Sequence, residues 1–209
     1  MSVARVLMAP AAKPFVLIAG LMPFLWLLYG ALNQQLGANP AEYLIRATGD
    51  WTLRFLCLVL AVTPARTMLG MPQLARFRRM LGLFVYFYAV LHVLCYTGFD
   101  MSFEVADILK DIAKRPFILV GTLAFLALTP LALTSFNRAI KQLGAQRWQR
   151  LHRGVYGVAA LAILHFFWMR SGKRNYAEVL VYALVLGSLL GWRLYRYLGR
   201  ERTGKTTRV

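Results

Sequence analysis

The sequence predicts an all-α integral membrane protein, a bundle of six transmembrane helices, and two observations support this. Hydrophobic residues make up 59% of the 209 residues, charged residues only 16%, and the mean hydropathy is +0.53. A soluble domain of this length is usually far less apolar. The apolar residues also fall into runs of about 18 or more, the length that a helix needs to cross a bilayer.

Six such runs follow one another along the chain, and each is interpreted as a transmembrane helix. They cover residues 15–32, 51–62 with a continuation past Pro64, 80–99, 117–134, 151–169 and 176–198. The second is the weakest, because its apolar stretch is short, Arg54 lies near its start, and Pro64 should end or kink the helix. The first follows Arg5 and Lys13 as a secretion signal would, but its apolar stretch is longer than a signal core, so we expect a retained anchor.

The distribution of lysine and arginine predicts that both termini are cytoplasmic. With this orientation the inner segments carry 16 of the 25 basic residues and the outer loops carry 7. Arg170, Lys173 and Arg174 in the last outer loop run against the pattern. Insertion rules and anionic lipid explain most of the net charge of +17, so we do not expect nucleic-acid binding. We expect one domain over residues 1–209 with short cytoplasmic tails.

All three histidines, His92, His152 and His165, lie inside or at the edge of a predicted span. Ionisable side chains in lipid are costly unless paired, so they mark functional sites by default. His92 lies 12 residues beyond Met80, and His165 lies 13 beyond His152, on helices that run in the same direction. At about 1.5 Å per residue, both lie roughly 18 to 20 Å from the inner ends of their helices.

Two neutral imidazoles at one depth are what a six-coordinate b-type haem requires. We therefore expect a haem between the third and fifth helices, with His92 and His165 as iron ligands. The alternative is that both are polar residues bonded to neighbouring helices. Small residues on the two helices could accommodate a macrocycle or simply allow close packing: Gly82, Ala89, Gly154, Gly157, Ala159 and Ala160.

His152 lies at the inner end of the fifth predicted span and has no histidine partner at the same depth. Counting back from His92 leads to Arg78 or Arg79. An inner haem would use Met80 as its second ligand or stay five-coordinate, and a flavin or quinone is a further alternative. On one continuous helix, His152 and His165 would point roughly 140° apart.

Four arginines are candidates for binding cofactor carboxylates or phosphates. Arg78, Arg79 and Arg153 gather at the inner ends of the third and fifth spans, where they either hold haem propionates or a flavin phosphate or serve as membrane anchors. Arg54 is the candidate for the propionates of the outer haem, because insertion rules do not require a cation there. Asp111, Lys114 and Arg115 form a charged outer loop that either docks a partner or is simply solvated.

Several separated motifs resemble one known family. They are Arg78-Arg-Met-Leu-Gly82, Tyr88-Ala-Val-Leu-His92, Asp111-Ile-Ala-Lys-Arg-Pro116, Leu128-Thr-Pro-Leu-Ala-Leu-Thr-Ser135 and Trp148-Gln-Arg-Leu-His-Arg-Gly-Val-Tyr156, followed by His165. In this order they are similar to the haem-binding membrane subunits of bacterial protein-methionine-sulfoxide reductases, the MsrQ/YedZ family. That family belongs to the ferric-reductase-like transmembrane superfamily, and the resemblance runs from about Gly49 to the sixth span.

The resemblance implies a single ferric-reductase-like transmembrane domain in the bacterial inner membrane, with His92, His152 and His165 as haem-ligand candidates. It also implies electron transfer from a cytoplasmic flavin reductase or a membrane quinol, through one or two b-type haems, to a periplasmic molybdopterin subunit that reduces methionine sulfoxide. FMN is associated with the family. Fuller superfamily members carry two histidines on each of two helices, whereas here the third span has one.

Other members that act alone carry a flavin and nicotinamide domain, but this sequence ends about 11 residues after the last span and has no Gly-rich nucleotide fingerprint. We therefore expect an electron-transfer subunit without the substrate-reducing site. Three alternatives remain: a ferric-reductase-like or quinol-oxidising cytochrome b serving another partner, a histidine-based proton-coupled transporter, and a non-catalytic scaffold. The transporter lacks a mid-membrane acid, and the scaffold gives the histidines no purpose.

Overall fold

The computed structural model describes residues 3–171 and 176–206, and the side chains of 4–171 and 176–199. Every regular element in this part of the chain is helical. The elements are α1 (Val3–Met8), α2 (Ala12–Leu32), α3 (Pro40–Met68), the 3-10 helix η1 (Pro72–Phe77), α4 (Arg78–Cys95), the π-helical turn η2 (Tyr96–Asp100), α5 (Val105–Lys114), α6 (Pro116–Leu133), α7 (Asn137–His152), α8 (Val155–Ser171) and α9 (Ala177–Thr206). Lys173 and Arg174 lie outside the described residues.

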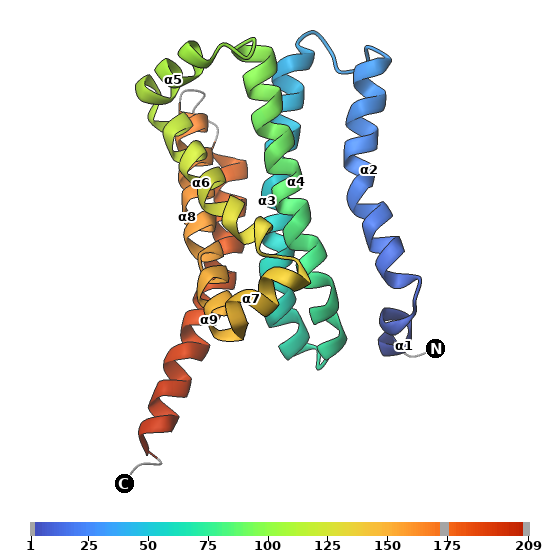
Figure 1. Cartoon of the computed structure of the whole chain (residues 1–209), viewed down its shortest axis with the longest axis vertical. Helices are drawn as coiled ribbons and strands as arrows, with labels where there is room; N and C mark the ends of the chain where they lie inside the picture. Colours follow the sequence, from blue (N-terminus) through green and yellow to red (C-terminus); the bar gives the residue numbers. More distant parts are fainter. Residues whose placement is uncertain (1–2, 172–175, 207–209) are drawn as a thin grey trace.

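The long helices form a bundle with α3 at its centre (Figure 1). Helix α3 packs along α4 on one side and against α9 on the other, while α6 packs along α8. Helix α2 stands at the flank and makes fewer contacts. Helix α5 lies at one end of the bundle, and α7 crosses the opposite end, toward which both termini lie.

Five helical segments are long and apolar enough to cross a membrane, which confirms the all-helical membrane class. They are Ala12–Leu32, Pro72–Asp100, Pro116–Leu133, Asn137–Ser171 and Ala177–Gly199. They contain five of the six predicted spans. Helix α3 is not among them, because Arg54 and Arg66 flank its short apolar stretch. The predicted count of six spans therefore rests on α3.

Helix α3 starts earlier than predicted. It begins at Pro40, where the Asn39 side chain accepts a hydrogen bond from the Glu42 N–H (3.1 Å) and caps the first turn. It continues past Pro64 to Met68, as predicted, so Pro64 does not end the helix.

The reason lies on α9. A proline has no N–H, so Pro64 leaves the Leu60 carbonyl, four residues earlier, without its helical partner. Arg193 supplies the missing donor: Nη2 donates to Leu60 O at 2.7 Å, and Nη1 donates to the Tyr156 hydroxyl at 2.6 Å. A side chain from another helix therefore allows α3 to continue.

His152 does not lie on the same helix as His165. It is the last residue of α7, and a turn at Arg153 and Gly154 separates it from α8. Helix α7 itself bends at Gly144, whose φ of 72° is open to glycine. The expected angle of about 140° between the two histidines therefore does not apply, because it assumed one continuous helix.

Tyr88 of α4 holds the outlying helix α2. Its side chain is completely buried, and its hydroxyl donates to Gly20 O at 2.8 Å and accepts from the Phe24 N–H at 3.0 Å. These two α2 groups would ordinarily bond to each other, so the hydroxyl is inserted into the helix next to Pro23. Gly20 also permits the close approach of Phe84 on α4, since a Cβ there would come within 2.3 Å of the Phe84 ring.

We predict that Arg193→Met lowers the free energy of unfolding by about 1.5–3 kcal/mol, because a buried carbonyl loses a charged donor. Unfolding in detergent, followed by circular dichroism, measures the loss. Arg196→Met is the matched control, since Arg196 is exposed and contacts only the Trp192 ring. In a Pro64→Ala background the residue at 64 regains its N–H, and Arg193→Met should then cost less. An equal loss in both backgrounds would contradict the explanation.

Candidate functional site

A cavity of about 690 Å³ lies between α3, α4, α6 and α8 toward the end of the bundle that carries α5. We call it the His92–His165 cavity, because both imidazoles line it. Most of its wall is apolar, and charged side chains are confined to a minority of positions. Its volume falls in the range of small-molecule and cofactor sites, about 300–1,000 Å³.

The two imidazole rings face each other across this cavity. Their centroids are 6.2 Å apart and their planes are inclined at 79°. His92 Nδ1 donates to the Ile45 carbonyl at 2.8 Å, and His165 Nδ1 donates to the Phe117 carbonyl at 2.7 Å. A carbonyl only accepts, so in each neutral ring Nδ1 carries the hydrogen and Nε2 keeps a lone pair. Within the described part of the chain, neither Nε2 has a hydrogen-bond partner.

A glycine lies against each of the two imidazole rings. A Cβ on Gly49 would lie 3.1 Å from His92 Cε1, and a Cβ on Gly121 would lie 2.8 Å from His165 Cε1. Sequence reasoning missed both glycines and selected others. Of those, Ala89 lines this cavity, whereas a Cβ on Gly157 would meet nothing within 4 Å. An isolated glycine in an apolar helix is the only signal that pointed to Gly49 and Gly121.

Three arginines at the cavity wall are each paired with a carboxylate. Arg46 pairs with Glu42, Arg115 with Asp111, and Arg170 with Glu178. The Arg170 side chain is only 12% exposed, and its Nε has no hydrogen-bond partner among the described residues.

Arg54, the arginine expected here, does not line this cavity. It lies over the Trp51 ring at 4.5 Å and donates from Nε to the Tyr182 hydroxyl at 3.3 Å. Its position on α3 turns it toward α9, because α3 packs between α4 and α9.

Asp111 belongs to the structure of the cavity wall. It is 9% exposed, accepts a hydrogen bond from the Tyr96 hydroxyl at 2.6 Å, and pairs with Arg115. It is therefore not available to dock a partner, unlike Lys114, whose side chain is exposed. The carboxylate joins α5 to the end of α4.

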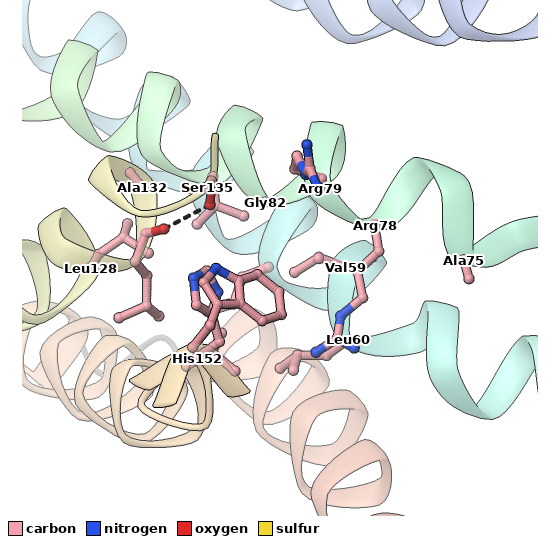
Figure 2. A pocket seen from close by; sticks show the side chains of 15 residues that line it. Val59, Leu60, Ala75, Arg78, Arg79, Gly82, Leu128, Ala132, Ser135 and His152 are labelled. Carbon is pink, nitrogen blue, oxygen red and sulfur yellow. Dashed lines mark hydrogen bonds between the residues drawn. The ribbon is translucent and has the colours of Figure 1, made fainter. Parts of the chain in front are cut away.

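A second cavity, of about 230 Å³, lies near α7 and is lined by His152, Arg78 and Arg79. We call it the His152 cavity, and Figure 2 shows His152 between Leu128 on one side and Arg78 on the other. Arg153 and Met80 are not part of its lining.

The His152 ring is engaged on one face and at one nitrogen. It stacks on Trp148 with ring centroids 4.0 Å apart, and its Nε2 lies 3.1 Å from Thr134 Oγ1. The Thr134 hydroxyl donates its single hydrogen to Pro130 O at 2.7 Å, so it accepts from Nε2–H of His152. The tautomer is thus opposite to that of His92 and His165.

Comparison with known proteins assigns the chain to a family. Residues 48–163 match the family described as the ferric reductase like transmembrane component, which places the chain in that class of membrane proteins. The match includes His92 and His152 and ends just before His165. No solved structure matches the chain.

Curated relatives narrow the class. The chain is 64% identical to the protein-methionine-sulfoxide reductase heme-binding subunit MsrQ of Polaromonas naphthalenivorans, over 94% of this chain and 90% of that protein. It is 50% identical to MsrQ of Herminiimonas arsenicoxydans, over 88% and 84%. It is also 42% identical to the magnetosome protein MamZ of Magnetospirillum gryphiswaldense, over 90% of this chain but 30% of that protein. The chain therefore belongs to the MsrQ family.

We predict that Asp111→Asn lowers the free energy of unfolding by about 1.5–3 kcal/mol, because the charge-assisted bonds to Tyr96 and Arg115 weaken. Thermal unfolding in detergent measures this. Asp107→Asn, on the same helix but exposed, is the control and should leave the melting temperature unchanged. Equal shifts for the two variants would show that the buried contacts of Asp111 do not stabilise the cavity wall.

Proposed function

We propose that this protein is a membrane electron-transfer subunit that holds a b-type haem between His92 and His165. The distance between the two rings is the observation that carries the proposal. Metal–imidazole bonds of about 2.0–2.1 Å put two ligating nitrogens about 4 Å apart and their ring centres about 6 Å apart. The observed separation of the ring centroids is 6.2 Å. Both rings also keep the tautomer that leaves Nε2 free to bind a metal.

The lining of the His92–His165 cavity also fits the rest of the haem. A haem has an apolar ring and two carboxylates, and the cavity combines an apolar lining with Arg46, Arg115 and Arg170. The buried and unpartnered Nε of Arg170 is a donor for a propionate oxygen. We therefore assign the propionates to these arginines in place of Arg54. When bound, the haem supplies reversible one-electron chemistry, while the protein supplies ligation and charge compensation.

We propose that α3 is the sixth span. It supplies the Ile45 carbonyl to His92 and contributes the buried residues Leu56 and Leu60 to the core of the bundle. Three of its charged residues, Glu42, Arg46 and Asp50, line the cavity. Arg54 donates to Tyr182 of α9, so these four residues need not face lipid. The end that carries α7 and both termini faces the cytoplasm, and the protein lies in the bacterial inner membrane.

Membership of the family supports the proposed electron route and partners. The MsrQ relatives are named as the heme-binding subunit of protein-methionine-sulfoxide reductase. We propose that electrons enter from a cytoplasmic flavin reductase or a membrane quinol. They leave the His92–His165 cavity for a periplasmic molybdopterin subunit that repairs oxidised envelope proteins. The substrate-reducing site belongs to that partner.

The His152 cavity, as it stands, does not fit a second haem or FMN. Its volume of about 230 Å³ is below the usual range for such ligands, and Nε2 of His152 is occupied by Thr134. We therefore assign one haem, and give Arg78, Arg79 and Arg153 no cofactor role.

We predict that His92→Ala and His165→Ala each abolish the same low-spin b-type haem signal, because each removes one of two axial ligands. Absorption spectra of the purified protein before and after dithionite measure this, with haem counted per chain. His152→Ala is the control, and should leave the low-spin signal in place.

Two outcomes would contradict the proposal. A colourless wild-type protein, purified from cells supplied with haem, would exclude a haem conduit and favour a transporter or scaffold. An identical loss from all three histidine variants would show that His92 and His165 are not a distinct ligand pair. Monodisperse elution in detergent separates either result from misfolding.

A further inference from the structure

We propose that Gly49 and Gly121 are positioning residues that hold the two axial imidazoles nearly perpendicular to each other. The inference rests on the proposed function, because it concerns the haem in the His92–His165 cavity. It goes beyond ligation, since it assigns the orientation of the ligands to two residues that are not themselves ligands.

The first half of the arrangement lies on α3 and α4. His92 reaches from α4 to the Ile45 carbonyl, and Gly49 follows Ile45 by four residues on α3. Residues four apart share one face of a helix. The carbonyl and the glycine thus form one surface, against which the edge of the ring lies.

The second half repeats this on α6 and α8. His165 reaches from α8 to the Phe117 carbonyl, and Gly121 lies four residues beyond Phe117 on α6. The same three parts, a carbonyl, a glycine four residues later and a histidine on the adjacent helix, therefore occur twice. The two rings held in this way have planes 79° apart.

The contact with the imidazole ring is what requires glycine at positions 49 and 121, and the conformation of the helices does not require it. A Cβ would come within 3.2 Å of Nδ1 at Gly49 and within 2.8 Å of Nδ1 at Gly121, which is the atom that donates to the carbonyl. A methyl group at Gly121 must displace the His165 ring, whereas one at Gly49 requires only a small shift of the His92 ring. Gly157 and Gly187, also on transmembrane helices, have nothing within 4 Å of an added Cβ.

The orientation of the rings has a spectroscopic consequence. An axial imidazole donates π density to the iron d orbital perpendicular to its own plane. Two perpendicular rings act on two different d orbitals and leave them nearly equal in energy, whereas two parallel rings act on one orbital and split the pair. Low-spin ferric haem then gives one highly anisotropic low-field line in the perpendicular case and three resolved rhombic lines in the parallel case.

Electron paramagnetic resonance of the oxidised, purified full-length protein tests this directly. We expect the single low-field line from wild type and from His152→Ala, which removes any contribution that depends on His152. Three rhombic lines from a wild type that binds low-spin haem would overturn the proposal. Because this measurement needs no glycine variant, it stays decisive even if a variant fails to fold.

Glycine variants then test which residues set the orientation. We expect Gly121→Ala to replace the low-field line with a rhombic or high-spin signal and to shift the midpoint potential. Gly49→Ala should have a smaller effect, because its contact is looser. Gly157→Ala and Gly187→Ala are the matched controls and should keep the wild-type signal. Wild-type spectra and potentials from both Gly121→Ala and Gly49→Ala would overturn the positioning role.

Failure of the proposed function has a different signature. A wild-type protein without haem would exclude the electron conduit itself. A wild-type protein with two histidine ligands but a rhombic signal would leave the conduit intact and remove only the positioning role.

Discussion

Every backbone carbonyl inside a membrane needs a hydrogen-bond donor, and this requirement organises the structure. Helix carbonyls are ordinarily satisfied within their own helix, so each departure requires a side chain from elsewhere. Arg193 serves the carbonyl that Pro64 leaves open, and Tyr88 is inserted between Gly20 and Phe24 of α2. These contacts join separate helices, so the same groups that complete the hydrogen bonding of one helix also hold the bundle together.

The His92–His165 pair depends on a second property of helix carbonyls. A carbonyl oxygen has two lone pairs, so Ile45 and Phe117 can accept from an imidazole while they remain part of a helix. Each such bond fixes a tautomer and a ring direction. Helix α3 lies at the centre of the bundle, where Glu42, Arg46 and Asp50 meet the cavity.

Much of the fold could be predicted, because composition and span length are constrained by the bilayer. The similar depth of His92 and His165 could be counted along the sequence, although the count for His165 began at His152 and crossed the turn at Gly154. The same turn is the reason why the direction of His152 relative to His165 could not be predicted.

The remaining errors concern contacts between helices. The sequence could not show whether the helix ends or kinks at Pro64, because the compensating donor, Arg193, lies about 130 residues away in the chain. Arg54 looked like a cavity residue because the sequence does not show which face of α3 meets α9. Gly49 and Gly121 escaped notice because their role depends on a ring that another helix supplies.

Helix α6 connects the surroundings of two histidines that are remote from each other. Near its start, Phe117 accepts from His165, and just past its end Thr134 accepts from His152 through its hydroxyl and from Trp148 through its carbonyl. An α-helix transmits a displacement along its axis with little compression. A displacement of Thr134 along the axis of α6 is therefore also a displacement of the Phe117 carbonyl that fixes the His165 ring.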